Sequence, residues 1–148
     1  MRNFILRNLA LTVLLLFVSF ITYGQQVEKT LVKSFNLQGN QVVTLQMDGP
    51  IEVKTWNNNF LRVQMQVTLK EGSEALLKSL VQAGRYNLRY EMDGEAYTVL
   101  APQLGLEVKV GGKPLQDVVS YLVYAPENVI VKVPESKNAG GAEATSSL

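Results

Sequence analysis

The most regular pattern in the chain is a strict alternation of apolar and polar residues from Leu61 to Lys70. Apolar side chains occupy every odd position of this segment, which is the period of a β-strand with one buried face. The same period predicts further strands, clearly at 86–92 and 104–110 and more weakly at 29–37, 41–47, 51–56, 96–101 and 128–133.

One segment, residues 73–83, has helical spacing instead. Its apolar residues fall on one side of a helix, and Glu74 and Lys78 lie four positions apart on the opposite side. Ser73 can cap the helix N-terminus, and Gly84 can end the helix. The pattern therefore predicts one short amphipathic helix, at about 73–83, that lies on a sheet face.

Short polar turns separate the predicted strands. Asp48-Gly49 and Asp93-Gly94 are Asp-Gly turns, Asn57–Asn59 tolerates left-handed backbone, and Gly111-Gly112 offers another reversal. Such turns are typical of antiparallel neighbours. We therefore predict a mostly β domain with one helix, built as an antiparallel sheet or sandwich or as a short β-solenoid-like domain. Its central strand is Val118–Ala125, whose two faces are both largely apolar.

The first 24 residues have the pattern of a secretory signal peptide. Arg2 and Arg7 are basic, Leu9–Ile21 is an apolar run, and Thr22 and Gly24 place small residues before a cleavage site. The run is shorter than the roughly 20 residues of a membrane-spanning helix. We predict three parts: a signal peptide at 1–24, a β-rich domain at 25–134 and a disordered tail at 135–148.

The same segment bears on localisation and charge. Lipoprotein acylation needs a cysteine directly after the signal segment, and the chain has none. Removing Arg2 and Arg7 from the 14 basic residues leaves 12 against 13 acidic ones, a net charge of −1. We predict an exported protein, periplasmic or extracellular, that is not a lipoprotein, does not insert stably into a membrane and lacks the basic charge of a nucleic-acid binder.

The chain contains neither histidine nor cysteine. Histidine-based triads, imidazole acid–base catalysis, thiolate nucleophiles and His/Cys zinc sites are therefore excluded. Two chemistries need neither residue: a carboxylate pair that hydrolyses a glycoside, from Glu52, Glu91 and Glu107, and a calcium site at Asp48 or Asp93. Because these acids stand singly on polar strand faces or in turns, we predict no catalytic activity, no metal and no cofactor.

Trp56, the only tryptophan, is followed directly by the amides Asn57, Asn58 and Asn59. An aromatic ring beside amide groups is typical of sugar-binding sites, where stacking and hydrogen bonds act together. These four residues are the candidate site for a carbohydrate or a peptide. The alternative interpretation is that Trp56 packs under the helix or against a neighbouring strand.

Two segments resemble a known family. Gly49–Trp56 (GPIEVKTW), continued by NNNFLRV to Val63, has a glycine turn, an I-x-V strand, a tryptophan, a polar turn and a second alternating strand. Tyr121–Pro126 (YLVYAP), followed by VIVKV at 129–133, has a Y-x-V-x-x-P step and then a V-x-V step. Both are similar to bacterial adhesin-like proteins of unknown function that are related to the auto-transporter adhesin head (GIN) domains. The resemblance spans about residues 30–134 and corresponds to the N-terminal part of that family, without its extended solenoid.

The signal segment and the missing catalytic residue types predict an exported, non-catalytic structural or interaction module of the cell envelope, and the resemblance implies an adhesin-like role. The alternative function is a carbohydrate- or peptide-binding module that uses Trp56 and Asn57–Asn59. The partner would be an envelope protein or a glycan. Unpaired edge strands could also add a strand from another chain, including a second copy of this one.

Overall fold

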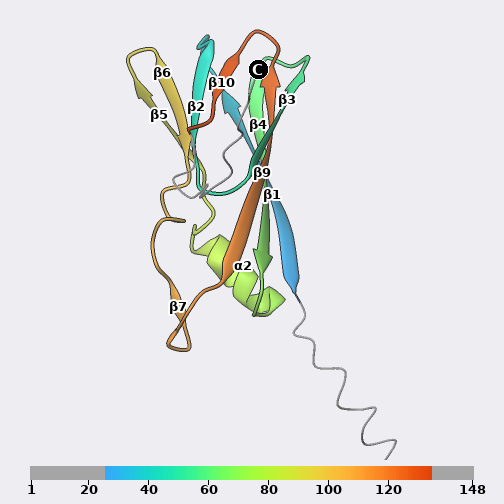
Figure 1. Cartoon of the computed structure of the whole chain (residues 1–148), viewed down its shortest axis with the longest axis vertical. Coiled ribbons are helices and arrows are strands. Elements are labelled where there is room, and N and C mark those ends of the chain that lie inside the picture. The colour runs from blue at the N-terminus through green and yellow to red at the C-terminus, as the bar shows by residue number, and fades with distance from the viewer. Residues whose placement is uncertain (1–25, 135–148) are drawn as a thin grey trace, which may run out of the picture.

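The computed structural model describes residues 26–134. The predicted signal peptide at 1–24 and the predicted tail at 135–148 lie outside the described residues. The described part of the chain folds into two four-stranded sheets, a two-stranded hairpin and a helix (Figure 1). The prediction of a mostly β domain with one helix is confirmed.

The first sheet, sheet A, contains the longest strands. Its order is β1 (Val27–Asn36), β4 (Phe60–Leu69), β9 (Asp117–Pro126) and β3 (Ile51–Trp56). β4 is antiparallel to β1 and β9, whereas β3 runs parallel to β9. β9 has a strand on each side, so the sequence prediction of a central strand at Val118–Ala125 is confirmed.

The second sheet, sheet B, has shorter strands. Its order is β10 (Ile130–Lys132), β2 (Val42–Gln46), β6 (Ala96–Leu100) and β5 (Arg89–Asp93). β2 is parallel to both neighbours, and β5 and β6 form the hairpin predicted at Asp93-Gly94. The Gly111-Gly112 turn closes a short hairpin of β7 (Lys109–Val110) and β8 (Lys113–Pro114).

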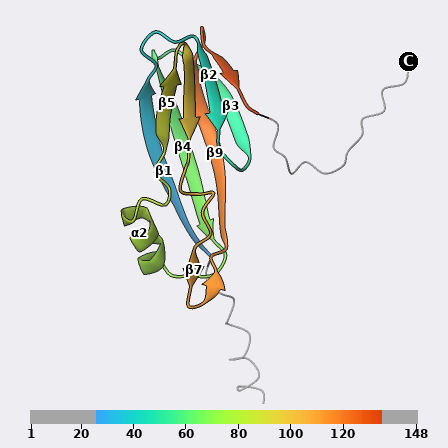
Figure 2. The same cartoon turned by 90° about the vertical axis from the view of Figure 1, so that its left-hand side faces the viewer.

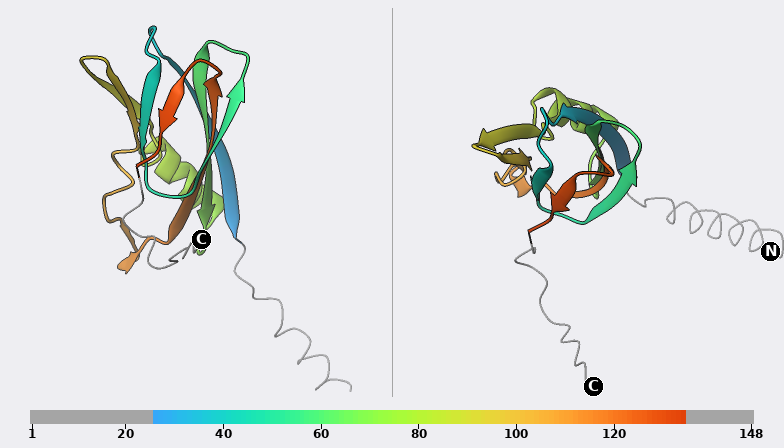
Figure 3. Two further views of the ribbon diagram at one scale, coloured as in Figure 1. Left: turned by 45° about the horizontal axis from the view of Figure 1, so that its top comes forward. Right: turned by 90° about the horizontal axis from the view of Figure 1, so that it is seen from above.

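The alternation along β4 places one face of sheet A in the core. Its five odd-numbered residues, Leu61 to Leu69, are at most 1% exposed, while the side chains between them remain partly or fully exposed. Sheet B adds Val43, Leu45, Tyr97 and Val99 to the same core. Seen from above, the strands of the two sheets surround this core (Figure 3). Burial of this apolar surface is the main term that stabilises the domain.

The predicted helix is confirmed as α2 (Glu74–Gln82). The Ser73 hydroxyl accepts a hydrogen bond from the Leu76 amide at 3.2 Å, and Gly84 follows the helix with a φ of 81°. Leu77 and Leu80 are its buried residues. The helix lies at the end of the domain where β1 begins and β4 ends (Figures 1 and 2).

The sheets are mixed, which differs from the antiparallel pairing that the turn residues suggest. β3–β9, β10–β2 and β2–β6 are parallel pairs. The Asp48-Gly49 turn leads from β2 in sheet B to β3 in sheet A, and the Asn57–Asn59 turn leads from β3 past β9 to β4. Turn residues specify a local change of direction, and they do not determine which strand becomes the neighbour.

The predicted strand at 104–110 is wrong except at its last two residues, which form β7. Residues 102–105 form turns instead, and Leu106 is exposed. The buried Arg85 donates from Nη1 to the carbonyl oxygens of Gln103 at 3.4 Å and Leu106 at 3.1 Å. A guanidinium therefore binds carbonyl groups that a neighbouring strand would otherwise bind. The predicted strand at 86–92 is also shorter than expected, because β5 begins only at Arg89.

Candidate functional site

The face of sheet A that points away from the core, here called the outer face, carries side chains in regular rows. Residues opposite each other on paired strands project to the same side of a sheet. The first row crosses all four strands and contains Ser34, Arg62, Tyr124 and Lys54. The next two rows contain Val32, Gln64, Leu122 and Glu52, and then Thr30, Gln66 and Ser120.

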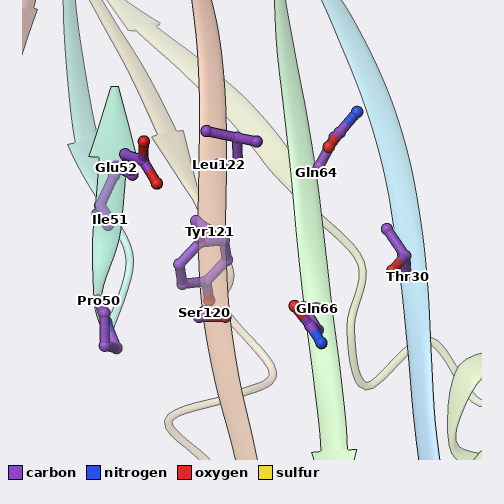
Figure 4. A pocket seen from close by; sticks show the side chains of 9 residues that line it. All are labelled: Thr30, Pro50, Ile51, Glu52, Gln64, Gln66, Ser120, Tyr121 and Leu122. Carbon is purple, nitrogen blue, oxygen red and sulfur yellow. The ribbon is translucent and has the colours of Figure 1, made fainter. Parts of the chain in front are cut away.

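A shallow depression of about 380 Å³ lies over the second and third rows (Figure 4). Its polar lining consists of Thr30, Glu52, Gln64, Gln66 and Ser120. Pro50, Ile51 and Leu122 add apolar surface, and the lining residues come from β1, β4, β9 and the start of β3 (Figure 4). The depression offers amide, hydroxyl and carboxylate groups, so it can both donate and accept hydrogen bonds.

Tyr121 also lines the depression and is only 3% exposed. Its hydroxyl has no hydrogen-bond partner among residues 26–134. Burial raises the pKa of this phenol, and the carboxylates of Asp48 and Asp117 raise it further. The Tyr121 side chain belongs to the buried, odd-numbered side of β9 together with Val119 and Val123, so its hydroxyl is part of the core and not of the outer face.

An aromatic cluster adjoins the first row. The Trp56 indole Nε1 donates to the Phe60 carbonyl oxygen at 3.0 Å, across the turn that joins β3 to β4. The Trp56 ring meets the Phe60 ring edge-on at 4.8 Å between centroids, and it lies 5.3 Å from the Tyr124 ring. Trp56 is thus held by two neighbours on the outer face.

Arg62 lies over this cluster. Its guanidinium carbon is 4.8 Å from the centroid of the Trp56 ring and 5.5 Å from that of Phe60. Its Nε is buried and has no hydrogen-bond partner in the described part of the chain. These distances are typical of cation–π contacts, which fix the guanidinium against the aromatic rings.

The neighbours of Trp56 in the structure therefore differ from those that the sequence led us to expect. Asn57, Asn58 and Asn59 are exposed in the turn after β3, while the ring contacts of Trp56 come from β4 and β9. Sequence reasoning did not single out Phe60, Arg62 or Tyr124. The alternation along β4 could have placed Phe60 and Arg62 together, because they are two positions apart and project to the side away from the core. Tyr124 joins them only because β9 lies beside β4.

A second polar cluster lies in the interior and is fully paired. Arg85 donates from Nε to Asp117 Oδ2 at 2.7 Å and from Nη2 to Oδ1 at 3.2 Å, and the Tyr86 hydroxyl donates to Oδ2 at 3.0 Å. The hydrogen bond to Asp117 is the main cause that raises the pKa of Arg85. Burial is the main cause that raises the pKa of Tyr86. Because the charges and hydrogen bonds are satisfied internally, we assign this cluster a structural role.

The acids considered for glycoside hydrolysis are dispersed. Glu52 lines the outer-face depression and lies 3.2 Å from Lys54 Nζ. Glu91 and Asp48 line a different hollow of about 800 Å³ at the ends of β2 and β6. Glu107 is exposed and lies 3.7 Å from Lys109 Nζ. Among residues 26–134, no group of three or more acidic side chains could hold a metal ion.

Comparison with known proteins gives one distant structural likeness. No family model matches the chain, and no curated protein matches it. The structure is similar to the crystal structure of a "putative cell adhesion protein" from Clostridium sporogenes, with 11% sequence identity and a TM-score of 0.39. The likeness covers 72% of this chain and 46% of that chain, which is less than half of the other protein. It does not show membership of the GIN-related family, and that resemblance stays a prediction.

Within residues 26–134, α2 is too short to cross a membrane, and no other helix there has the length and apolar character to do so.

Proposed function

We propose that this protein is an exported, non-catalytic interaction module of the cell envelope, and that its ligand binds the outer face of sheet A. The N-terminal sequence pattern supports export. The resemblance of residues 49–63 and 121–133 to adhesin-like proteins supports a role in attachment. One structural observation carries the proposal: a fixed aromatic cluster adjoins a polar depression on a single sheet face.

The physical properties of the outer face suit binding. Strands β4 and β9 are anchored by buried residues on their other side, so the outer side chains project from a rigid support. The rings of Trp56, Phe60 and Tyr124 hold one another in place, which lowers the entropy lost when a ligand docks on them. The amides and hydroxyls of the depression can then orient the ligand through hydrogen bonds.

The dispersion of the acidic residues supports a non-catalytic role. Glycoside hydrolysis without histidine needs two carboxylates that flank one bond. Glu52 and Glu91 line different hollows, and Glu52 is ion-paired. Binding, by contrast, needs only hydrogen-bonding groups and aromatic rings, and the outer face has both.

Nuclear magnetic resonance titration tests the binding face. The full chain is expressed with its own N-terminal segment, labelled with ¹⁵N, and titrated with a panel of envelope glycans and peptides. We expect a ligand to shift the amide signals of Gln64, Leu122 and Tyr124, and to leave those of Arg89 and Glu91 on β5 unchanged. Shifts confined to another surface would contradict the binding face, and turnover of any probe would contradict the non-catalytic role.

A matched pair of tyrosine variants sharpens this test. Tyr124→Ala removes an outer-face ring, and we expect affinity to fall by about tenfold, since one well-packed aromatic contact contributes on the order of 1 kcal/mol or more. Tyr90→Ala removes a partly exposed ring from sheet B, and we expect affinity to change by less than about twofold, because this ring lies off the proposed face. Circular dichroism confirms that both variants are folded. Equal effects of the two variants would count against the outer face.

Cell fractionation tests the proposed export. We expect the chain in the periplasmic or extracellular fraction, with an N-terminus at Gln25. Protease treatment of intact cells then separates surface display from a periplasmic location. Recovery of the full-length chain from the cytoplasm would contradict the proposal.

A further inference from the structure

We infer that the outer face binds an acidic glycan, one that carries carboxylates on its sugar rings, and that Arg62 is its anion-binding residue. This inference rests on the proposed function, because it names the ligand class of the same face. It starts from a guanidinium group that the fold holds in place without giving it a counter-ion.

Arg62 is fixed by aromatic rings and not by an acid. The ion pairs among residues 26–134 are Lys54–Glu52, Arg85–Asp117 and Lys109–Glu107, and Arg62 takes part in none of them. Its guanidinium lies over Trp56 and Phe60, and its Nε is buried without an acceptor. A positively charged group that is immobilised and unpaired is suited to an incoming anion, because little side-chain freedom remains to be lost on binding.

The guanidinium shape favours anions that present two oxygens. Its planar set of donors matches the two oxygens of a carboxylate, and such two-point contacts are stronger than neutral hydrogen bonds. Contact with the aromatic rings forms no hydrogen bond to these donors, since a cation–π contact is the attraction of the cation to the face of the aromatic ring. Because Nε is buried, the two Nη groups are the donors that Arg62 can offer to a ligand carboxylate while its guanidinium stays over the rings.

Lys54 supplies a second positive charge in the same row. Tyr124 lies between Arg62 and Lys54 in the strand register. The Lys54–Glu52 pair joins side chains that are 51% and 67% exposed. Exposed pairs of this kind contribute little stability, so Lys54 can turn to a ligand carboxylate at low cost. The row thus offers two cations on either side of an aromatic ring, which fits a chain of charged sugars.

The remaining groups of the face favour a glycan over a peptide. Extended peptides bind by adding to the edge of a sheet, where main-chain groups are free. On the outer face, the main-chain groups of β4 and β9 are already paired within sheet A. What the face offers instead is Gln64, Gln66 and Ser120, whose amides and hydroxyl can bind the many hydroxyl groups of a sugar.

The test compares charged and neutral forms of one sugar backbone. The probes are oligomers of galacturonate, mannuronate and hyaluronan, each with its carboxyl-reduced derivative, and poly-glutamate as an acidic peptide. The full chain is titrated with each probe, and binding is followed by amide shifts on the outer face and by fluorescence of Trp56, the single tryptophan. We expect at least one uronate oligomer to bind the outer face, its reduced form to bind at least about tenfold more weakly, and the affinity to fall as salt rises.

Three variants locate the anion site. Arg62→Gln should weaken uronate binding by about tenfold or more, because it removes a charge-assisted contact. Arg62→Lys keeps the charge but not the planar donor set, and should retain part of the affinity. Lys54→Gln changes an exposed side chain and should lower the salt dependence. Arg89→Gln, which removes an exposed arginine from β5, is the matched control and should bind like the wild type.

Several results would overturn this inference while the proposed function stands. They are equal binding of the reduced and charged sugars, unchanged affinity in Arg62→Gln and Lys54→Gln, or preference of the outer face for poly-glutamate. A neutral glycan or peptide that binds the outer face when no uronate does would have the same consequence. If no probe in the wider panel shifts outer-face signals, both the inference and the proposed binding face are wrong.

Discussion

Arg85 and Asp117, which lie 32 positions apart in the chain, form a two-point ion pair in the protein interior. Their side chains are only 8% and 9% exposed. The pair ties the segment after α2 to the first residue of β9, and the same guanidinium binds two carbonyl groups of the turns near Gln103. One side chain thereby joins three segments, and its contact with the Leu106 carbonyl lies inside the segment 104–110 where the sequence pattern predicts a strand.

Asp117→Asn should destabilise the domain strongly. The substitution leaves the Arg85 charge buried without a counter-ion, and loss of one partner of a buried pair costs about 3–5 kcal/mol. Urea denaturation measures the free energy of unfolding. Glu107→Gln is the control, because it removes an exposed acid near Lys109 and should change stability by less than about 1 kcal/mol. Equal losses in the two variants would show that the interior pair is not stabilising.

The free energy of unfolding should depend on pH through Asp117. Burial by itself would raise the pKa of this carboxyl, but hydrogen bonds from Arg85 and Tyr86 outweigh it and hold the pKa below 3.8. A depressed folded-state pKa gives stability that is complete above the unfolded pKa, about 3.9, and is lost as pH falls through the folded pKa.

We therefore expect the urea concentration at the unfolding midpoint of the wild type to decrease when the pH is lowered below about 4. The midpoint of Asp117→Asn should be lower at neutral pH and should fall less steeply in acid, because the titrating group is absent. Midpoints measured from about pH 7 to about pH 2 check this expectation. Parallel curves for the two proteins would mean that other carboxylates cause the acid loss.

Gly49→Ala should be destabilising for two reasons that act together. Gly49 has a φ of +123°, which side-chain-bearing residues rarely adopt, and a Cβ there would lie 2.5 Å from the Val119 carbonyl oxygen. We expect a loss of at least about 2 kcal/mol, measured by thermal or urea unfolding. Gly105→Ala meets no atom within 4 Å and has no positive φ, so its effect should stay within about 0.5 kcal/mol. A neutral Gly49→Ala would contradict the close approach of this turn to β9.

Leu61→Ala should distinguish the two faces of β4. Leu61 is fully buried, and truncating a buried leucine removes apolar contacts and leaves a cavity, at a cost of about 2–5 kcal/mol. Thr68→Ala truncates a side chain on the outer face and should cost less than about 1 kcal/mol. Similar losses would mean that the outer face is as well packed as the core.

The local patterns predicted the elements whose burial repeats regularly. The alternation at Leu61–Lys70 corresponds to β4, the apolar run at Val118–Ala125 lies within β9, and Ser73 caps α2. The predictions of β4 and α2 succeed because each period matches one buried face. The pattern at 104–110 has the same period and fails, because a strand also needs a paired neighbour; within this segment the Leu106 carbonyl group accepts from Arg85 instead.

The candidate site was predictable only in part. Trp56 is conspicuous in the sequence as the only tryptophan, Arg62 lies on the polar face of the strand predicted at 61–70, and Phe60 directly precedes that strand. Tyr124 and Lys54 complete the row only through the order β4, β9, β3. That order includes a parallel pair, which the turn residues did not suggest.

The sequence by itself determined which residues alternate, where the helix begins and ends, and which catalytic chemistries are excluded, since the chain has no histidine and no cysteine. These properties follow from residue types and from spacings of a few positions. The tertiary structure alone decided which strands are neighbours, what surrounds Trp56 and Arg62, and why residues 102–105 turn. Those outcomes depend on contacts between segments far apart in the chain, such as that of Arg85 with Asp117. The spacing of residues over a few positions gives no information about the free energy of such contacts.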